Sequence, residues 1–417
     1  MPPHSPQPEA SAKHTAAGPR GARPLRILTY SSLYPNAAQA NHGVFVENRL
    51  RHLLASGAVE SRVVAPVPWF PLKAAMFGHY AALAQVPAAE RRHGIEVSHP
   101  RYPVIPKLGM TLAPWLMYAW TRRHVAEILR SGYDFDLIDA HYFYPDGIAA
   151  VMLGRAIGKP VTITARGTDI NLIPRYPLAR RMILWAGRHA AAMIAVCQAL
   201  KTEMTSIGLD GARIRVLRNG VALSAFQPSD GAAARSDLGL KSPVLLSVGA
   251  LIPRKGHDLV IQALPRIPGA TLLIAGQGPE EARLRDLAAR LELDARARFL
   301  GPVPHAELKT IYGAADVLVL ASDREGWPNV LLEAMACGTP VAATDIWGNP
   351  EVVTEARAGR LIPTRTPEAI AETVRAILAD PPARAATRAY AEGFDWQETT
   401  DGQIALFNEI LSRTQTR

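Results

Sequence analysis

The part of this 417-residue chain that most constrains its fold lies between residues 316 and 340. Residues 316–321 form an apolar run that is typical of a buried parallel strand. Pro328 disfavours helical geometry at the residue before it, so we expect a loop to continue to that point. Asn329 is a favourable N-cap for a helix over residues 330–336. A strand, a tight loop and a helix in this order predict an α/β unit whose helix N-terminus binds anions, above all phosphate.

Two glutamates flank this predicted anion site. Glu325 lies in the loop, and Glu333 lies about one turn into the helix. A carboxylate repels phosphate, but it accepts hydrogen bonds from hydroxyl groups beside the phosphate. Phosphate in the middle with hydroxyls at both ends describes a nucleotide-sugar. Taken singly, the glutamates also have a plainer explanation, in which Glu333 complements the helix dipole and Glu325 is solvated.

The stretch over residues 323–338 resembles the E-x7-E segment of the family-4 retaining glycosyltransferases, with Glu325 and Glu333 as its two glutamates. Further stretches that resemble the same family lie at residues 34–35, 42–47, 166–169, 219–221 and 249–256. The resemblance implies the GT-B architecture, an α/β fold in which two Rossmann-like, doubly wound parallel-sheet domains face each other across a cleft. It also implies that the donor binds mainly to the second domain and the acceptor to the first.

The length of the chain suits two domains rather than one core. A hydrophobic content of 48% and a charged content of 20% indicate globular domains. We expect a disordered extension over residues 1–24, an acceptor-side domain over 25–212 and a donor domain over 213–397, with a polar linker at 222–242. By the resemblance, a last helix over 398–417 packs back on the first domain. Strands are predicted at residues 25–31, 62–67, 136–140, 160–165, 193–197, 244–248, 271–275, 298–300 and 340–344.

The cysteine content and the apolar runs bear on location. Cys197 and Cys337 lie among small apolar residues, so we interpret them as buried free thiols of a reducing compartment. No apolar run is long enough to span a membrane, and the N-terminus lacks an apolar signal core. We therefore expect a cytoplasmic protein, with a peripheral position on the inner face of the cytoplasmic membrane as a further hypothesis.

Positive charge is concentrated in the first half of the chain. Residues 1–207 carry 23 of the 46 basic residues but only 12 of the 37 acidic ones. Such a surface suits nucleic acid, an anionic membrane or an anionic substrate. No nucleic-acid-binding module is recognisable, so we expect no nucleic-acid partner. The predicted helix over residues 112–129 places Trp115 and Trp120 beside Arg122 and Arg123, which is typical either of an interfacial membrane helix or of a core helix with a solvated basic end.

The first domain offers several candidate residues at the predicted carboxyl ends of its strands, where open α/β sheets bind ligands. Gly43 precedes the predicted helix over 44–55; the resemblance implies that it lets the backbone approach the donor, and the alternative is an ordinary helix-entry glycine. His141 is a candidate for acceptor contact or for a structural hydrogen bond. Arg166 stands where the family usually has a histidine near the transferred sugar, and it could hold a phosphate or an anionic sugar. Asp169 either fixes Arg166 or caps the following helix.

Two aspartates formally match a metal-binding D-x-D motif. Asp134 and Asp136 precede the strand over 136–140 instead of following it, so we interpret them as turn residues. No metal ion and no cofactor other than the donor nucleotide is then expected.

The second domain places Arg254 and Lys255 after the strand over 244–248 and before a glycine and a helix, which suits a diphosphate; a surface charge pair is the alternative. By the resemblance, catalysis falls to Glu325, Arg166, Lys255 and Arg254. The expected donor-binding residues are Gly43, Asp169, Arg254, Lys255, Leu300 near the base, Glu325, Gly326, Trp327, Asn329, Val330, Leu331 and Glu333.

The resulting prediction is a metal-independent retaining glycosyltransferase. It would move a hexosyl unit from a UDP- or GDP-sugar to a glycan or lipid-linked acceptor in cell-surface polysaccharide synthesis. Two alternatives remain: a GT-B sugar-nucleotide epimerase or hydrolase, and a non-catalytic protein that binds sugar or lipid.

Overall fold

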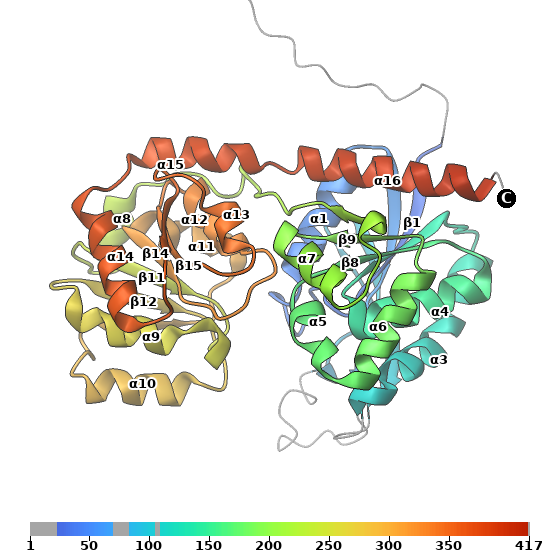
Figure 1. Cartoon of the computed structure of the whole chain (residues 1–417), viewed down its shortest axis with the longest axis horizontal. Coiled ribbons are helices and arrows are strands. Elements are labelled where there is room, and N and C mark those ends of the chain that lie inside the picture. The colour runs from blue at the N-terminus through green and yellow to red at the C-terminus, as the bar shows by residue number, and fades with distance from the viewer. Residues whose placement is uncertain (1–22, 70–82, 105–108, 416–417) are drawn as a thin grey trace, which may run out of the picture.

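The computed structural model describes residues 23–69, 83–104 and 109–415. The described residues form two α/β units that lie side by side along the longest axis of the molecule (Figure 1). Most of the extension expected over residues 1–24 lies outside the described residues. So do Phe70, Met76, Phe77 and Tyr80.

The first unit is built on an eight-stranded sheet with the order β10-β9-β8-β7-β1-β2-β5-β4. Its strands are parallel except β4, which runs antiparallel to β5. The bounds are β1 Leu25–Tyr30, β2 Val59–Val64, β4 Ala89–Arg92, β5 Ile95–Ser98, β7 Leu137–His141, β8 Val161–Ala165, β9 Ala192–Ala195 and β10 Ile214–Val216. A separate pair joins β3, Val67–Trp69, to β6, Arg101–Pro103. The order reverses at β1, between β2 and β7, which is where such sheets bind ligands.

Helices cover both faces of this sheet. They are α1 Val44–Ala55, α3 Gly109–Arg130, α4 Ile148–Ile157, α5 Thr168–Asn171, α6 Pro177–His189, α7 Gln198–Ser206 and α16 Gln397–Gln415, with a π-helical turn η2 at Phe143–Gly147 and a 3-10 turn η3 at Ile173–Arg175. Side chains alternate along a strand. Ile27 therefore packs with α1 and α16, and its neighbour Leu28 packs with α3 and α4 on the other face.

The second unit has a fully parallel six-stranded sheet with the order β13-β12-β11-β14-β15-β16. This is the doubly wound order of a Rossmann-type sheet, with its reversal between β11 and β14. The strands are β11 Val244–Val248, β12 Thr271–Ala275, β13 Ala297–Gly301, β14 Val317–Leu320, β15 Val341–Thr344 and β16 Gly359–Ile362. The helices are α8 Gly231–Asp237, α9 His257–Ala263, α10 Glu281–Arg290, α11 Leu308–Ala314, α12 Asn329–Ala336, α13 Asn349–Val352, α14 Pro367–Ala379 and α15 Arg384–Ala391, with 3-10 turns η5 Pro253–Lys255, η7 His305–Glu307 and η8 Glu392–Phe394.

Most predicted strands match the observed ones within two residues, and those at 244–248 and 271–275 match at both ends. The second strand was misplaced. The prediction over 62–67 spans the end of β2 and the start of β3, because the apolar residues of these two strands form one nearly continuous run in the sequence. The predicted linker at 222–242 contains the helix α8, which Asp230 caps by accepting hydrogen bonds from two helix amides.

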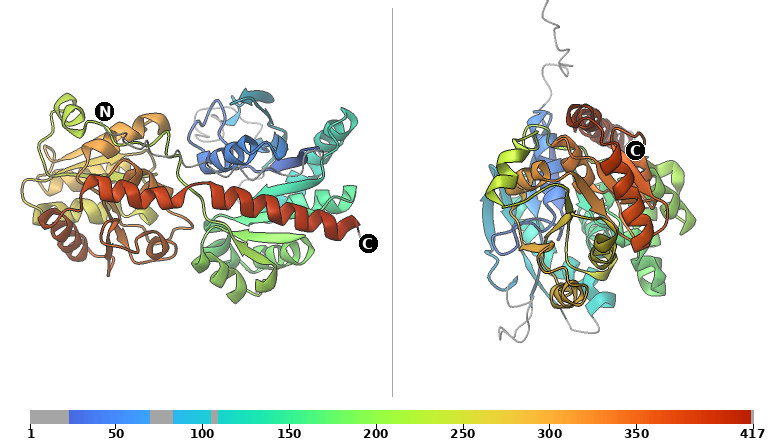
Figure 2. Two further views of the ribbon diagram at one scale, coloured as in Figure 1. Left: turned by 90° about the horizontal axis from the view of Figure 1, so that it is seen from above. Right: turned by 90° about the vertical axis from the view of Figure 1, so that its left-hand side faces the viewer.

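The chain crosses twice between the units. The first crossing follows β10, which pairs with β9, so the first sheet runs beyond residue 212. The second crossing leads into α16, which lies along the first unit (Figures 1 and 2). Phe407 of α16 is fully buried in the same cluster as Ile27. The two crossings touch, because the Val221 amide donates to the Phe394 carbonyl over 2.8 Å.

None of the helices in the described part of the chain has the length and apolar character that crossing a bilayer requires.

Candidate active site

A lysine and a glutamate from two neighbouring strands form the centre of the site. Lys255 ends η5 after β11, and Glu325 lies in the loop after β14, on the two sides of the sheet reversal. The Lys255 Nζ atom lies 2.6 Å from Glu325 Oε1. Ser322 Oγ donates to the same oxygen over 2.6 Å. The sequence predicted that the two residues share one hollow, and they lie in contact.

Arg254 and Glu325 complete this charged group. The Arg254 Nη1 atom lies 3.6 Å from Glu325 Oε2 and donates to the Arg324 carbonyl over 2.7 Å. Burial alone would raise the pKa of Glu325, but the charges of Lys255 and Arg254 outweigh burial and hold the pKa below its ordinary value. Glu325 is therefore an ionised acceptor, and two cations beside it are available to an anionic ligand.

Glu333 lies on α12 and is held from two sides. His305 Nε2 is 2.8 Å from Glu333 Oε1, and the Tyr312 hydroxyl donates to Oε2 over 2.9 Å. Burial alone would lower the pKa of His305, but its hydrogen bond to Glu333 raises the pKa above its ordinary value. The carboxylate thus has a fixed orientation and still has lone pairs for further donors.

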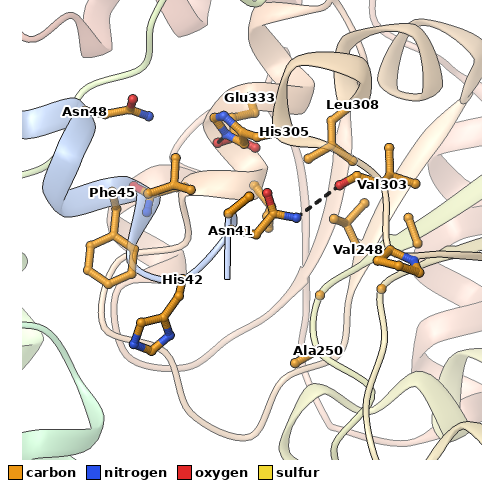
Figure 3. Close-up of a pocket in the computed structure, with 18 of the residues that line it drawn as sticks. Asn41, His42, Phe45, Asn48, Val248, Ala250, Val303, His305, Leu308 and Glu333 are labelled. Carbon is orange, nitrogen blue, oxygen red and sulfur yellow. Dashed lines mark hydrogen bonds and ion pairs between the residues drawn. The ribbon is translucent and has the colours of Figure 1, made fainter. Parts of the chain in front are cut away.

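Two adjoining hollows lie between the units, and both are lined by residues of each. The larger has a volume of about 860 Å³, and Glu333 lines it together with apolar side chains such as Val248, Val303 and Leu308 (Figure 3). At its rim Asn41 of the first unit donates to the Val303 carbonyl of the second over 3.3 Å. The smaller has a volume of about 360 Å³ and contains Lys255, Arg254 and Glu325.

The wall from the first unit is built at the ends of β7 and β8. Arg166 lines the smaller hollow, but its guanidinium is already bonded, with Nη1 donating to Asn219 Oδ1 over 3.1 Å and Nη2 lying 2.6 Å from His141 Nδ1. His141 is buried and makes the structural hydrogen bonds that formed one of its two predicted roles. Asp169 holds the backbone of the loop and not the side chain of Arg166. Its carboxylate accepts hydrogen bonds from the amides of Phe143, Arg166 and Gly167.

The two units meet closely beside the smaller hollow. A Cβ atom added to Gly326 would lie 2.0 Å from the Arg166 carbonyl oxygen. A Cβ atom added to Gly167, on the same loop as Arg166, would lie 3.0 Å from the Gly326 amide nitrogen, and its φ of 134° favours glycine. The Cys197 thiol donates to the Gly326 carbonyl over 3.2 Å. The loop that carries Glu325 is thus fitted directly onto the first unit.

The structure differs from the sequence-based picture at the start of α12. Asn329 is the first helical residue and not the N-cap, which is Pro328. The amides of Asn329 and Leu331 donate to the carbonyls of Trp327 and Pro328, so these two of the expected phosphate donors are used within the loop. Asn329 and Val330 line both hollows.

Other expected donor residues lie around the hollows with different roles. Leu331 is buried in the core, and Leu300 packs against that core, whereas Pro302 and Val303 line the larger hollow. Gly43 has a φ of 72° as the residue before α1, and an added Cβ atom would lie 2.3 Å from the Leu33 carbonyl oxygen. The glycine is therefore required by the packing of its own loop. Gly326 and Trp327 line the smaller hollow as expected of a binding loop.

Three residues of the smaller hollow are absent from the expected donor-binding set. Tyr142 has a φ of 84°, a strained conformation for a non-glycine residue that is concentrated at functional sites. Asn171 is buried, and its Oδ1 atom has no hydrogen-bond partner among the described residues. Asn219 was noted only within the stretch over 219–221 that resembles the family, although its side chain contacts both units. Only the Tyr142 position, directly after a strand and beside His141, carried a usable sequence signal.

Asp134 and Asp136 lie away from this site. Asp134 pairs with Lys159 over 2.7 Å, and Asp136 accepts hydrogen bonds from the Arg23 side chain and the Arg26 amide. In the described ranges no group of three or more His, Cys, Asp and Glu side chains could hold a metal ion.

Two family models match the chain and between them cover most of it. The model of glycosyltransferase family 4 matches residues 43–225, and the model of group-1 glycosyl transferases matches residues 232–394. The chain belongs to the family-4 glycosyltransferases. The boundary between the two matches falls just after the first crossing, so each structural unit corresponds to one family model.

Relatives and solved structures agree with this assignment. D-inositol 3-phosphate glycosyltransferase of Mycobacteroides abscessus is 37% identical over 214 residues, which are 49% of this chain and 48% of that protein. The chain thus spans about half the length of the curated relatives it matches. Sucrose-phosphate synthase of Thermosynechococcus elongatus matches with a TM-score of 0.77 at 20% identity, over 94% of this chain and 100% of that one. Anabaena HepE in complex with UDP matches with a TM-score of 0.69 at 23% identity, over 94% and 100%. The fold is GT-B.

Proposed function

We propose that this chain transfers a hexosyl unit from a UDP- or GDP-sugar to a hydroxyl of a glycan or lipid-linked acceptor, with retention of configuration and without a metal ion, in the assembly of a cell-surface polysaccharide. The observation that carries the proposal is the contact of Lys255 with Glu325 in a hollow lined by both domains. The crystal structures of the related HepE fold with UDP and with UDP-glucose support a nucleotide-sugar as the donor.

The two hollows suit the two parts of such a donor. The larger hollow offers apolar walls to a base and the oriented carboxylate of Glu333 to the ribose hydroxyls. Four cationic side chains line the smaller hollow against a single acid, Glu325, and they are Arg166, Arg254, Lys255 and Arg324. This excess of positive charge suits a diphosphate. Asn171 Oδ1 and the remaining lone pairs of Glu325 are acceptors for the hydroxyls of the sugar.

The proposed chemistry breaks the bond between the anomeric carbon and the β-phosphate oxygen and forms a bond from that carbon to the acceptor oxygen. Lys255 and Arg254 would neutralise the charge that grows on the departing diphosphate, and one such donor contributes about 3–4 kcal/mol in well-studied enzymes. Among the residues that the structure describes, Glu325 is the sole carboxylate that lines the smaller hollow, and Lys255 and Ser322 hold it. We therefore assign the proton of the acceptor hydroxyl to the departing phosphate oxygen, on the same face of the sugar, which yields retention.

Radiolabelled UDP- and GDP-sugars, offered with and without a bacterial membrane extract, test this proposal. Transfer of label to a glycan or lipid only with extract would support it, and NMR of the new linkage would report retention. Free sugar formed without extract would instead indicate the epimerase or hydrolase alternative. Binding of nucleotide-sugar without turnover would indicate a binding protein. Lys255→Ala should lower transfer about 100- to 1,000-fold, whereas Lys241→Ala, at an exposed lysine of the same domain, should leave it unchanged.

A lipid-linked acceptor requires access to a membrane, and the outer face of α3 suits this contact. Leu112, Trp115 and Trp120 are 42%, 55% and 51% exposed on that face. They are followed by the exposed Arg122 and Arg123. Exposed tryptophans beside basic residues are typical of helices that lie at an anionic bilayer surface.

Liposome flotation measures this contact. Vesicles rich in phosphatidylglycerol should bind the chain, and Trp115→Ser with Trp120→Ser should weaken binding several-fold. The matched control replaces two exposed leucines of the second domain, Leu238→Ser with Leu291→Ser. Equal binding to neutral phosphatidylcholine vesicles would contradict the electrostatic part of the proposal.

A further inference from the structure

Buried polar side chains close a hydrogen-bonded ring next to the smaller hollow. Its members come from five separate segments of the chain, and each is at least nine-tenths buried. In order around the ring they are Asp139, Gln403, Arg49, Asn219, Arg166 and His141. Most are far apart in sequence, so only the assembled first domain, including α16, brings them together.

One half of the ring joins α16 to the first crossing. Gln403 of α16 donates through Nε2 to Asp139 Oδ2 over 2.7 Å and accepts through Oε1 from Arg49 Nε over 2.8 Å. Arg49 Nη1 then donates to Asn219 Oδ1 over 3.3 Å. A single glutamine thus connects an acid on β7 with an arginine on α1.

The other half fixes the state of His141. Arginine carries only donors, so the 2.6 Å contact of Arg166 Nη2 makes His141 Nδ1 an acceptor. The proton of the neutral ring then lies on Nε2, which is 3.3 Å from Asp139 Oδ2. Burial lowers the pKa of His141 to about 4, which agrees with a neutral ring. Every contact around the ring therefore pairs a donor with an acceptor.

The ring is connected to the donor-binding loop through one residue. Asn219 Nδ2 donates to Asn329 Oδ1 at the start of α12 over 3.2 Å. The Asn219 carbonyl accepts from Trp327 Nε1 over 2.9 Å. Asn219 lies at the first crossing between the domains. Its side chain and its carbonyl together link the first domain to the loop that carries Glu325.

We propose that this ring fixes the orientation of the two domains, with Asn219 and Arg166 as positioning residues and not as groups that contact the transferred sugar. Both terminal nitrogens of Arg166 form hydrogen bonds within the ring, and only its Nε atom has no partner among the described residues. A buried polar network of this kind favours one arrangement, because breaking one link leaves the other groups buried and unpaired. The inference depends on the proposed function only where turnover is measured.

Spin labels placed on the two domains test the proposal without any substrate. Ala126 on α3 and Ala282 on α10 are exposed, so Ala126→Cys and Ala282→Cys accept labels, whereas the natural cysteines are buried. We expect a narrow distance distribution by double electron–electron resonance in the parent chain. Gln403→Met and Asn219→Ala should each broaden it, and the double variant should broaden it no further.

The matched control is Glu409→Gln, at a residue that lies on α16 like Gln403 but forms an exposed ion pair with Arg215. It should leave the distance distribution unchanged. Gln403→Met keeps the length of the side chain, so it serves if Asn219→Ala fails to fold. A distribution as narrow as that of the parent, in a ring variant that is folded by near-ultraviolet circular dichroism, would overturn the proposal.

Turnover gives a second readout that separates this inference from the proposed function. If the chain transfers sugar, Gln403→Met should lower kcat about ten-fold with a donor KM within two-fold of the parent, because alignment is lost and not binding. Broadening without any transfer by the parent chain would support the ring and contradict the proposed function. Transfer at the parent rate despite broadening would contradict the positioning role.

Discussion

His305 Nε2 lies 2.8 Å from Glu333 Oε1, although the two residues belong to different elements, η7 and α12. With Tyr312 on the other oxygen, the carboxylate is oriented before any nucleotide arrives. Pre-orientation of this kind reduces the entropy lost on binding. The larger hollow is therefore lined by a carboxylate whose orientation is already fixed.

Replacing Glu333 by Gln or Ala should weaken nucleotide binding. A hydrogen bond to a charged group contributes about 1.5–3 kcal/mol, so the dissociation constant of UDP or GDP should rise about 10- to 100-fold. Isothermal titration calorimetry measures this directly. Glu307→Gln, at an exposed glutamate of the neighbouring turn, is the control. Unchanged affinity in the Glu333 variants would refute the ribose assignment.

Lys255→Ala should lower turnover far more than it lowers donor affinity. The lysine is placed to meet charge that develops on the leaving group, and loss of one such donor costs about 100- to 1,000-fold in kcat. Steady-state kinetics with the donor identified in the transfer assay provides the test. A rise in KM at unchanged kcat would mean that Lys255 only binds the ground state.

Gly326→Ala should hold the two domains apart. Its Cβ atom would lie 2.0 Å from the Arg166 carbonyl oxygen, and a backbone atom cannot move aside as a side chain can. We expect a larger radius of gyration by small-angle X-ray scattering and at least a ten-fold loss of turnover. Gly393→Ala is the control, because no atom lies within 4 Å of its added Cβ. Full activity of Gly326→Ala would show that this contact is dispensable.

The buried imidazole of His141 should make stability depend on pH. Burial lowers its pKa from 6.5 to about 4, so the folded chain keeps it neutral where the unfolded chain protonates it. The stabilisation is then complete above pH 6.5 and is lost as the pH falls towards 4, by about 1.4 kcal/mol for each pH unit.

Urea unfolding of the parent and of His141→Gln between pH 8 and pH 5 isolates this effect, because other titrating groups cancel in the difference. The difference in unfolding free energy should be constant above neutral pH and shrink below it. A difference that does not vary with pH would mean that His141 is not held neutral.

The sequence predicted those parts of the site that one short segment determines. Lys255 and Glu325 each follow an apolar strand, and the ends of neighbouring parallel strands meet at one edge of a sheet. The start of α12 was shifted by one residue, because Asn329 bonds across the domains instead of capping its own helix.

The parts of the site that could not be predicted from the sequence depend on contacts between distant segments of the chain. Gln403 lies on an exposed-looking helix, and nothing near it in sequence indicates that it is buried between Arg49 and Asp139. Likewise the bonds of Arg166 to Asn219 and His141 could not be read from its neighbours in sequence. Hydrogen-bond partners of this kind are fixed by tertiary packing, which local propensity does not encode.

The contact between the two chain crossings affects how the second domain can move. It is an insertion within the first domain, held by two chain segments that lie against each other at Val221 and Phe394. Two adjacent tethers act as a hinge. They permit rotation of the second domain about one axis and oppose its rotation about the other.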